Sequence, residues 1–254
     1  MRLTITYVVL AGALTAQTKM PVAPKDYGQF ETLVSPGPGG GLSPDGKWLA
    51  YGINRSNRNN ELRITGIADA TTKVVAFGAQ VAFSSDSKWA AYSIGVSESQ
   101  EEKLKKDKKP VRKKLGLLNL ATGEQSVVDG VELFAFSPGG AWLAFRRYAP
   151  EKPEKKDKTD SADDSEDETA PGATLIVRQL STGRDTTFGN VSEFAWQNLP
   201  KQGRLLAIAI SAEDKTGNGV QLFDPQTGAL RALDSSPSVY RAWPGARKAP
   251  TWPS

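Results

Sequence analysis

The chain has 254 residues, with 32 lysines and arginines against 28 acids, a formal net charge of +4. It contains no cysteine and no histidine. Disulfides and thiolate metal sites are therefore excluded, and so is a Ser-His-Asp triad, because its general base is an imidazole.

The N-terminal residues 1–16 have the pattern of a secretory signal peptide. Arg2 precedes an uncharged apolar run, which ends in small residues at Ala13 and Ala16. Such a run is too short to span a bilayer comfortably. We expect cleavage after Ala16, with Ala13 as the alternative, and a buried first strand as the competing interpretation. The expectation is an exported protein, periplasmic or extracellular, without a membrane span after cleavage. Residues 17–29 would form a linker.

One sequence motif recurs along residues 30–233. A turn of the Ser-Pro-Asp-Gly type is followed by a tryptophan and a short apolar run. The three clear copies are Ser43–Tyr51, Ser84–Tyr92 and Ser137–Phe145, and a degenerate fourth copy lies at Leu205–Ile208. Repetition at roughly 40–50 residues indicates stacked supersecondary units rather than one undivided core.

Each copy predicts four antiparallel strands. The proline, aspartate and glycine suit a tight turn between the first two strands, and the apolar run is typical of a strand buried on both faces. A third strand, a second turn and an outer strand follow. The third strands begin near Glu61, Leu115, Thr174 and Val220. Four such strands, repeated radially, form a β-propeller blade. The predicted fold class is all-β, a partial β-propeller with about four blades present.

Two charged insertions interrupt successive repeats at the same place, after the second strand. Residues 97–114 hold eight lysines and arginines against four acids, whereas residues 150–170 of the second insertion (150–172) hold nine acids against four lysines. Such segments bury too little apolar surface to offset the entropy of ordering. We expect solvated loops on one face of the propeller, or alternatively a weak contact between the loops or with a partner.

Two motifs approach catalytic or nucleotide-binding patterns and fail. Gly41–Lys47 matches the glycine and lysine spacing of a P-loop, but the next residue is Trp48, where the motif needs serine or threonine. Gly95–Ser99 approaches a nucleophile elbow but lacks its last glycine. No catalytic, cofactor-binding or metal-binding residue is therefore assigned, and the chain is not expected to be an enzyme.

The remaining candidates have structural explanations. Asp45 and Asp86 occupy matching turn positions, and the run Asp157–Glu168 lacks the spacing of a calcium loop. The basic insertion has no interleaved aromatics for stacking bases, so nucleic acid is not an expected partner. Six aromatics at matching places predict packing between blades, with a binding role as the alternative. They are Trp48, Trp89, Trp142, Tyr51, Tyr92 and Phe145.

These phrases resemble the WD-like repeats of TolB-type propellers, and they look most like the N-terminal propeller of secreted prolyl-oligopeptidase-family serine peptidases. In that family the propeller covers an α/β-hydrolase domain and controls substrate access. The resemblance, over residues 30–233, implies a non-catalytic substrate-gating module without its hydrolase domain. The alternative is a stand-alone TolB-like periplasmic protein-binding scaffold. Either would take a peptide or protein as its ligand.

The repeat pattern stops near the C-terminus, and residues 234–254 are expected to form an irregular tail. We interpret the array as truncated, with a closed four-bladed ring as the alternative. A truncated array leaves apolar faces on its first and fourth blades, and this predicts self-association through the open faces. The residues expected there include Trp48, Tyr51, Leu206 and Ile208.

Overall fold

The computed structural model describes residues 23–37, 41–150, 172–197, 204–212, 217–237 and 240. The predicted signal segment, most of the second charged insertion and most of the predicted tail lie outside these ranges. Within them, strands account for most of the ordered structure, which confirms the all-β prediction. No helix in the described ranges is long and apolar enough to cross a bilayer.

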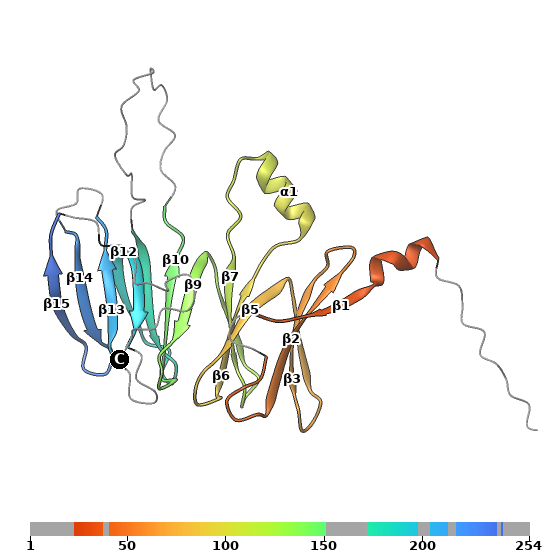
Figure 1. Cartoon of the computed structure of the whole chain (residues 1–254), viewed down its shortest axis with the longest axis horizontal. Helices are drawn as coiled ribbons and strands as arrows, with labels where there is room; N and C mark the ends of the chain where they lie inside the picture. The colour runs from red at the N-terminus through yellow and green to blue at the C-terminus, as the bar shows by residue number, and fades with distance from the viewer. Residues whose placement is uncertain are drawn as a thin grey trace, which may run out of the picture.

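The strands pair in chain order, and every pair is antiparallel (Figure 1). The first sheet contains β1 (Glu31–Val34), β2 (Trp48–Arg55), β3 (Glu61–Gly66) and β4 (Thr72–Ala76). The second contains β5 (Gly78–Phe83), β6 (Trp89–Ile94), β7 (Lys114–Asn119) and β8 (Gln125–Val128). The third contains β9 (Val131–Phe136), β10 (Trp142–Arg147), β11 (Ala173–Gln179), β12 (Asp185–Trp196), β13 (Leu206–Ile210), β14 (Gly219–Asp224) and β15 (Ala229–Ser235).

The third sheet combines two four-stranded groups that share β12. The first half of this long strand pairs with β11, and its second half, from Val191 to Trp196, pairs with β13. We therefore describe four units: unit 1 (β1–β4), unit 2 (β5–β8), unit 3 (β9–β11 and the first half of β12) and unit 4 (the rest of β12 and β13–β15). Figure 1 shows them in a row, with unit 1 and unit 4 at opposite ends. The sheets are consistent with a propeller, but the described residues do not close into a ring.

The turn before each second strand is built by its own side chains. The Ser43 hydroxyl donates to Asp45 Oδ1 at 2.7 Å and accepts the Trp48 N–H at 2.9 Å. Gly46 has a φ of 71°, which a residue with a side chain rarely adopts. The hydrogen bond from Ser43 holds the pKa of Asp45 below its usual value. Asp86 accepts the equivalent bond from Ser84 at 2.6 Å. Both aspartates therefore serve turn chemistry, as predicted.

Successive side chains of each second strand point to alternate faces of its sheet and pack against the units next to it. The central alanine of each phrase packs toward the following unit, in the clusters that join successive units. These alanines are Ala50, Ala91 and Ala144. The two residues that flank it pack toward the preceding unit and are at most 2% exposed. These pairs are Ala90 and Tyr92, Leu143 and Phe145, and Leu206 and Ile208.

The predicted packing of the aromatics between units is confirmed at five of the six positions. Tyr92 and Phe145 are buried, and the three tryptophans are half-buried against the inter-unit clusters. Tyr51 instead lies half-buried on the side of unit 1 that faces away from unit 2. The prediction of an open face was wrong for Trp48, which packs against the cluster between units 1 and 2. It was also wrong for Leu206 and Ile208, because both are 0% exposed against unit 3.

The first charged insertion is partly helical, so the prediction of a loop was wrong for α1 (Glu98–Lys106). Ser97 Oγ accepts the Gln100 N–H at 3.3 Å, and Gln100 Oε1 accepts the Ser97 N–H at 3.3 Å, which forms a capping box. Glu101 also pairs with Lys105 one turn later, at 2.6 Å. The helix buries no residue, so local sequence rather than core packing stabilises it. The other helix, the 3-10 helix η1 (Pro24–Gln29), falls in the predicted linker.

We expect trypsin to cut first in the stretch from Lys103 to Lys109. No α1 side chain is buried, and exposed segments of this kind open most readily. Mass spectrometry of the early fragments identifies the site. First cleavage at Lys114, at the start of β7, would contradict the expectation that α1 opens more readily than the strands.

Candidate functional site

A cavity of about 530 Å³ opens between units 1 and 2, beside α1. Its apolar lining comes from Val34, Leu62 and Phe77, and its amide groups come from Asn54 and Asn60. In Figure 1 α1 lies at the end of units 1 and 2 from which this insertion emerges. An apolar lining with a few polar groups at its rim is typical of ligand sites.

The first turns of α1 form one wall of this cavity. Glu98 and Glu101 line it, and Glu98 is ion-paired with Arg58 from the turn between β2 and β3. The hydrogen bond from Lys105 lowers the pKa of Glu101, so this carboxylate stays charged at neutral pH. Together with Glu61, the lining holds three carboxylates and one arginine. Each of these carboxylates already has a cationic partner: Arg58 for Glu98, Lys105 for Glu101, and both Arg55 and Arg63 for Glu61. The lining therefore presents carboxylate oxygens without an excess of negative charge.

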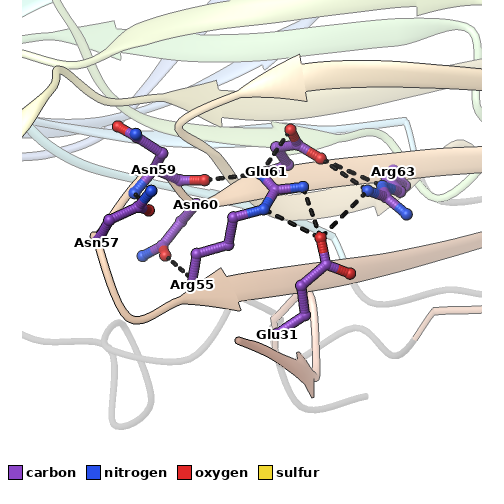
Figure 2. A network of polar contacts seen from close by, with 7 residues as sticks. All are labelled: Glu31, Arg55, Asn57, Asn59, Asn60, Glu61 and Arg63. Atoms are coloured by element: carbon purple, nitrogen blue, oxygen red, sulfur yellow. Dashed lines mark hydrogen bonds and ion pairs between the residues drawn. The ribbon is translucent and has the colours of Figure 1, made fainter. Parts of the chain in front are cut away.

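A network of charged side chains on unit 1 adjoins the cavity (Figure 2). Arg55 Nη1 lies 2.6 Å from Glu61 Oε1, and Arg55 Nη2 donates to Glu31 Oε1 at 2.8 Å. Arg63 Nη2 donates to the other oxygen of Glu61 at 3.0 Å. Strand register explains the grouping, because Glu31 lies opposite Arg55 and Glu61 lies opposite Ile53.

The same network positions the turn that carries Arg58. Arg55 Nη1 donates to the Asn59 carbonyl oxygen at 2.9 Å, and the Arg55 N–H donates to Asn60 Oδ1 at 3.0 Å. Hydrogen bonding by Arg55 lowers the pKa of Glu61, and Glu61, followed by Glu31, raises the pKa of Arg55. The network therefore connects the sheet of unit 1 to the rim of the cavity.

Replacing Glu61 with glutamine should reduce the dependence of stability on acidic pH. The folded-state pKa of Glu61 is depressed, so its contribution exists above its unfolded pKa and is lost as pH falls through the folded value. Because water screens this surface network, we expect the loss at pH 7 to stay below about 1 kcal/mol. Urea unfolding at pH 7 and in the acid range measures both variants, with Glu124→Gln as the control. An acid limb as steep in Glu61→Gln as in the wild type would contradict this assignment.

At the ends of the units opposite α1, hydrogen bonds join the turns of successive units. The Asp45 N–H donates to Ser87 Oγ at 3.0 Å, and the Ser85 hydroxyl donates to the Pro138 carbonyl oxygen at 2.6 Å. A second cavity, of about 650 Å³, lies beside these turns between units 2 and 3. Arg178 lines it, but two hydrogen bonds bind this arginine to Asp185, at 2.8 and 2.7 Å. These turns and the Arg178 guanidinium therefore already have hydrogen-bond partners within the protein.

The dismissed motifs have structural roles. Gly41–Lys47 forms an isolated bridge at Leu42 and the turn that leads into β2, and Ser97 of the Gly95–Ser99 motif caps α1. In the described part of the chain, no three acidic residues are grouped so that they could hold a metal ion. Sequence reasoning missed Arg58, Glu98 and Glu101 as site residues. The one signal for Glu98 and Glu101 was the Ser97–Gln100 pair, which indicates a helix start.

No known family profile matches the chain, and no curated protein matches it. Solved structures do match, at identities that show likeness of fold alone. Acylaminoacyl peptidase from Pyrococcus horikoshii is 13% identical over 83% of this chain, with a TM-score of 0.46. The β-propeller domain of the Trilobed protease from Pyrococcus furiosus is 9% identical over 81% of this chain and 58% of its own, with a TM-score of 0.46. TolB from Acinetobacter baumannii is 15% identical over 81% of this chain and 44% of its own, with a TM-score of 0.39. The chain spans about a third (33%) of the length of the acylaminoacyl peptidase.

Proposed function

We propose that the chain is a non-catalytic propeller module in which each of the four units is a blade, and that it binds peptides at the cavity beside α1. The observation that supports this function is the cavity itself between units 1 and 2, with its apolar lining and the carboxylate groups at its rim. In the sequence resemblance, this role corresponds to the substrate-gating part of an exported prolyl-oligopeptidase-family peptidase. The alternative remains a TolB-like scaffold for folded partners.

The chemistry of the rim favours a peptide with a basic group. Glu98 and Glu101 place carboxylates at one wall, while Asn54 and Asn60 offer amides that can bond to a peptide backbone. Val34 and Phe77 supply apolar surface for an aliphatic stem. A lysine side chain, with its apolar stem and charged end, fits this combination.

Fluorescence anisotropy with labelled nine-residue peptides tests the proposal. One peptide carries a single lysine, and its match carries norleucine at that position. We expect tighter binding of the lysine peptide, and a loss of about tenfold in the double variant Glu98→Gln/Glu101→Gln, equivalent to about 1.4 kcal/mol. Glu124→Gln serves as the matched control. Equal affinity for both peptides would refute the carboxylates of Glu98 and Glu101 as the determinant, and binding of folded envelope proteins alone would favour the scaffold.

We also propose that the protein is exported and processed. The support comes from the sequence of residues 1–16. N-terminal sequencing of protein secreted or released from a bacterial periplasm should begin after Ala16 or Ala13. An intact Met1 on the exported protein would contradict it.

Purified protein should not hydrolyse peptide or ester substrates. Without histidine, an imidazole general base is missing, and removal of such a base from a serine peptidase lowers kcat by several orders of magnitude. Release of nitroanilide from chromogenic peptides measures this directly. Turnover that follows the protein through successive purification steps would overturn the non-catalytic assignment.

A further inference from the structure

One face of unit 1 carries large apolar side chains that no other described unit covers. Leu33, Leu42, Leu49 and Val74 are 70%, 56%, 40% and 55% exposed. Strand pairing places them on one side of the sheet, since Leu33 lies opposite Ile53, Leu42 opposite Leu49, and Val74 opposite Arg63. Arg63 in turn lies opposite Tyr51, so Tyr51 belongs to the same surface. We call this surface the outer face of unit 1.

The residues equivalent to Leu49 and Tyr51 in every other unit are buried against the preceding unit. The counterparts of Leu49 are Ala90, Leu143 and Leu206, and those of Tyr51 are Tyr92, Phe145 and Ile208. All six are at most 2% exposed. The repeat therefore places on the outer face of unit 1 the same kind of side chains that form interfaces elsewhere in this chain. Exposed apolar surface of this kind marks an interaction site.

The second strand of unit 4, at the opposite end of the array, does not offer a matching open face. Ala207 occupies the position of Ala50, which in this repeat faces the following unit, yet Ala207 and Ala209 are 0% and 2% exposed. A head-to-tail contact between unit 4 of one copy and unit 1 of another would need that surface free. Contact between two outer faces of unit 1 needs no other surface. Such a pairing is isologous and closes as a dimer.

Charge supports the pairing of two identical faces. The outer face carries Glu31 and Glu61 together with Arg55 and Arg63, which is two acids and two arginines. Arg63 stands where unit 2 has Gly116 and unit 3 has Ile176, opposite the equivalent aromatic. The face therefore differs from the internal interfaces by presenting both signs of charge. Because the two acids and the two arginines are paired within each copy, two such faces can meet across a two-fold axis without net repulsion.

We propose that two copies of this chain form a dimer through the outer faces of unit 1, with Leu33, Leu49 and Tyr51 at its apolar centre. This inference does not rest on the proposed peptide-binding function. Glu61 borders both surfaces, but Leu33, Leu49 and Tyr51 do not line the cavity beside α1.

Sedimentation velocity over a concentration series tests the dimer. We expect the wild type to dimerise by about 50 μM and the double variant Leu33→Arg/Leu49→Arg to raise the dissociation constant at least about tenfold. Val127→Arg is the matched control, since Val127 is 54% exposed on β8, away from the outer face. A monomeric wild type, or an equal shift in the control, would overturn the proposal. Circular dichroism confirms that each variant is folded.

The absence of cysteine allows a second measurement that does not depend on the arginine variants. A cysteine introduced at Leu49 is unique in the chain. Near a two-fold axis it should form a disulfide between copies under mild oxidation, whereas Val127→Cys should stay monomeric on a non-reducing gel. Equal cross-linking of the two variants would contradict a specific interface.

Discussion

Replacing Phe145 with alanine lowers the free energy of unfolding by about 3–5 kcal/mol. The ring is 0% exposed in the cluster between units 2 and 3, among residues that include Ala91, Leu117 and Leu143. The guanidinium of Arg178 lies over it, 5.4 Å from its centre. A domain is stable by only roughly 5–15 kcal/mol, so one substitution removes a large share of the total. Urea unfolding of both proteins gives the difference directly.

Tyr51→Ala is the matched control, because Tyr51 occupies the same position of the repeat in unit 1. Its ring is half-buried on the outer face instead of between two units. In the monomer, we expect it to cost less than about 1.5 kcal/mol, in keeping with the smaller area removed from water. A cost equal to that of Phe145→Ala would show that the outer face is packed like an internal interface even in the monomer.

Gly116→Ala should cost about 1–3 kcal/mol, although it adds a single methyl group. A Cβ at this position would lie 2.1 Å from Cε2 and 2.5 Å from Cζ of Tyr92. The Tyr92 ring cannot readily withdraw, because it is 2% exposed and its hydroxyl accepts a hydrogen bond from Gln125 Nε2 at 3.1 Å. The added methyl group therefore has to displace either the Tyr92 ring or the backbone of β7, and both movements disturb the packing of unit 2 against unit 1.

The control for this substitution is Gly189→Ala, on β12. A Cβ at Gly189 would meet no atom within 4 Å, and Gly189 does not have the positive φ that restricts side chains. Alanine there should change stability by less than about 0.5 kcal/mol. Thermal unfolding of the two variants in parallel separates the steric effect from the general effect of losing a glycine. Equal melting temperatures would refute the assigned clash.

The sequence predicted the repeating units well because turn and strand signals are local. Ser43, Asp45 and Gly46 act within one turn, so their spacing alone predicts the bend between two strands. The same holds for α1 in retrospect. Its Ser97–Gln100 capping pair is a local signal, but the charged composition of the insertion favoured a loop.

The faces of the strands could not be predicted in the same way. A strand turns alternate side chains to opposite sides, but its sequence does not say which neighbour lies on which side. Leu206 and Ile208 were therefore expected on an open face and are buried against unit 3. Likewise, Arg55 meets Glu31 and Glu61 only because of the register between three strands. Nothing in the spacing of these residues along the chain indicates that network.

The links between units give them little mechanical independence. Phe77, Gly130 and Asn190 occupy matching places at the three boundaries, and all three have a positive φ. The carbonyl oxygen of each accepts an N–H from the end of the next unit's second strand, and the donors are Gly95, Tyr148 and Ser211 respectively. Strain that opens one unit is therefore transmitted along the backbone and its hydrogen bonds into the next. The four described units should yield together, as one cooperative block.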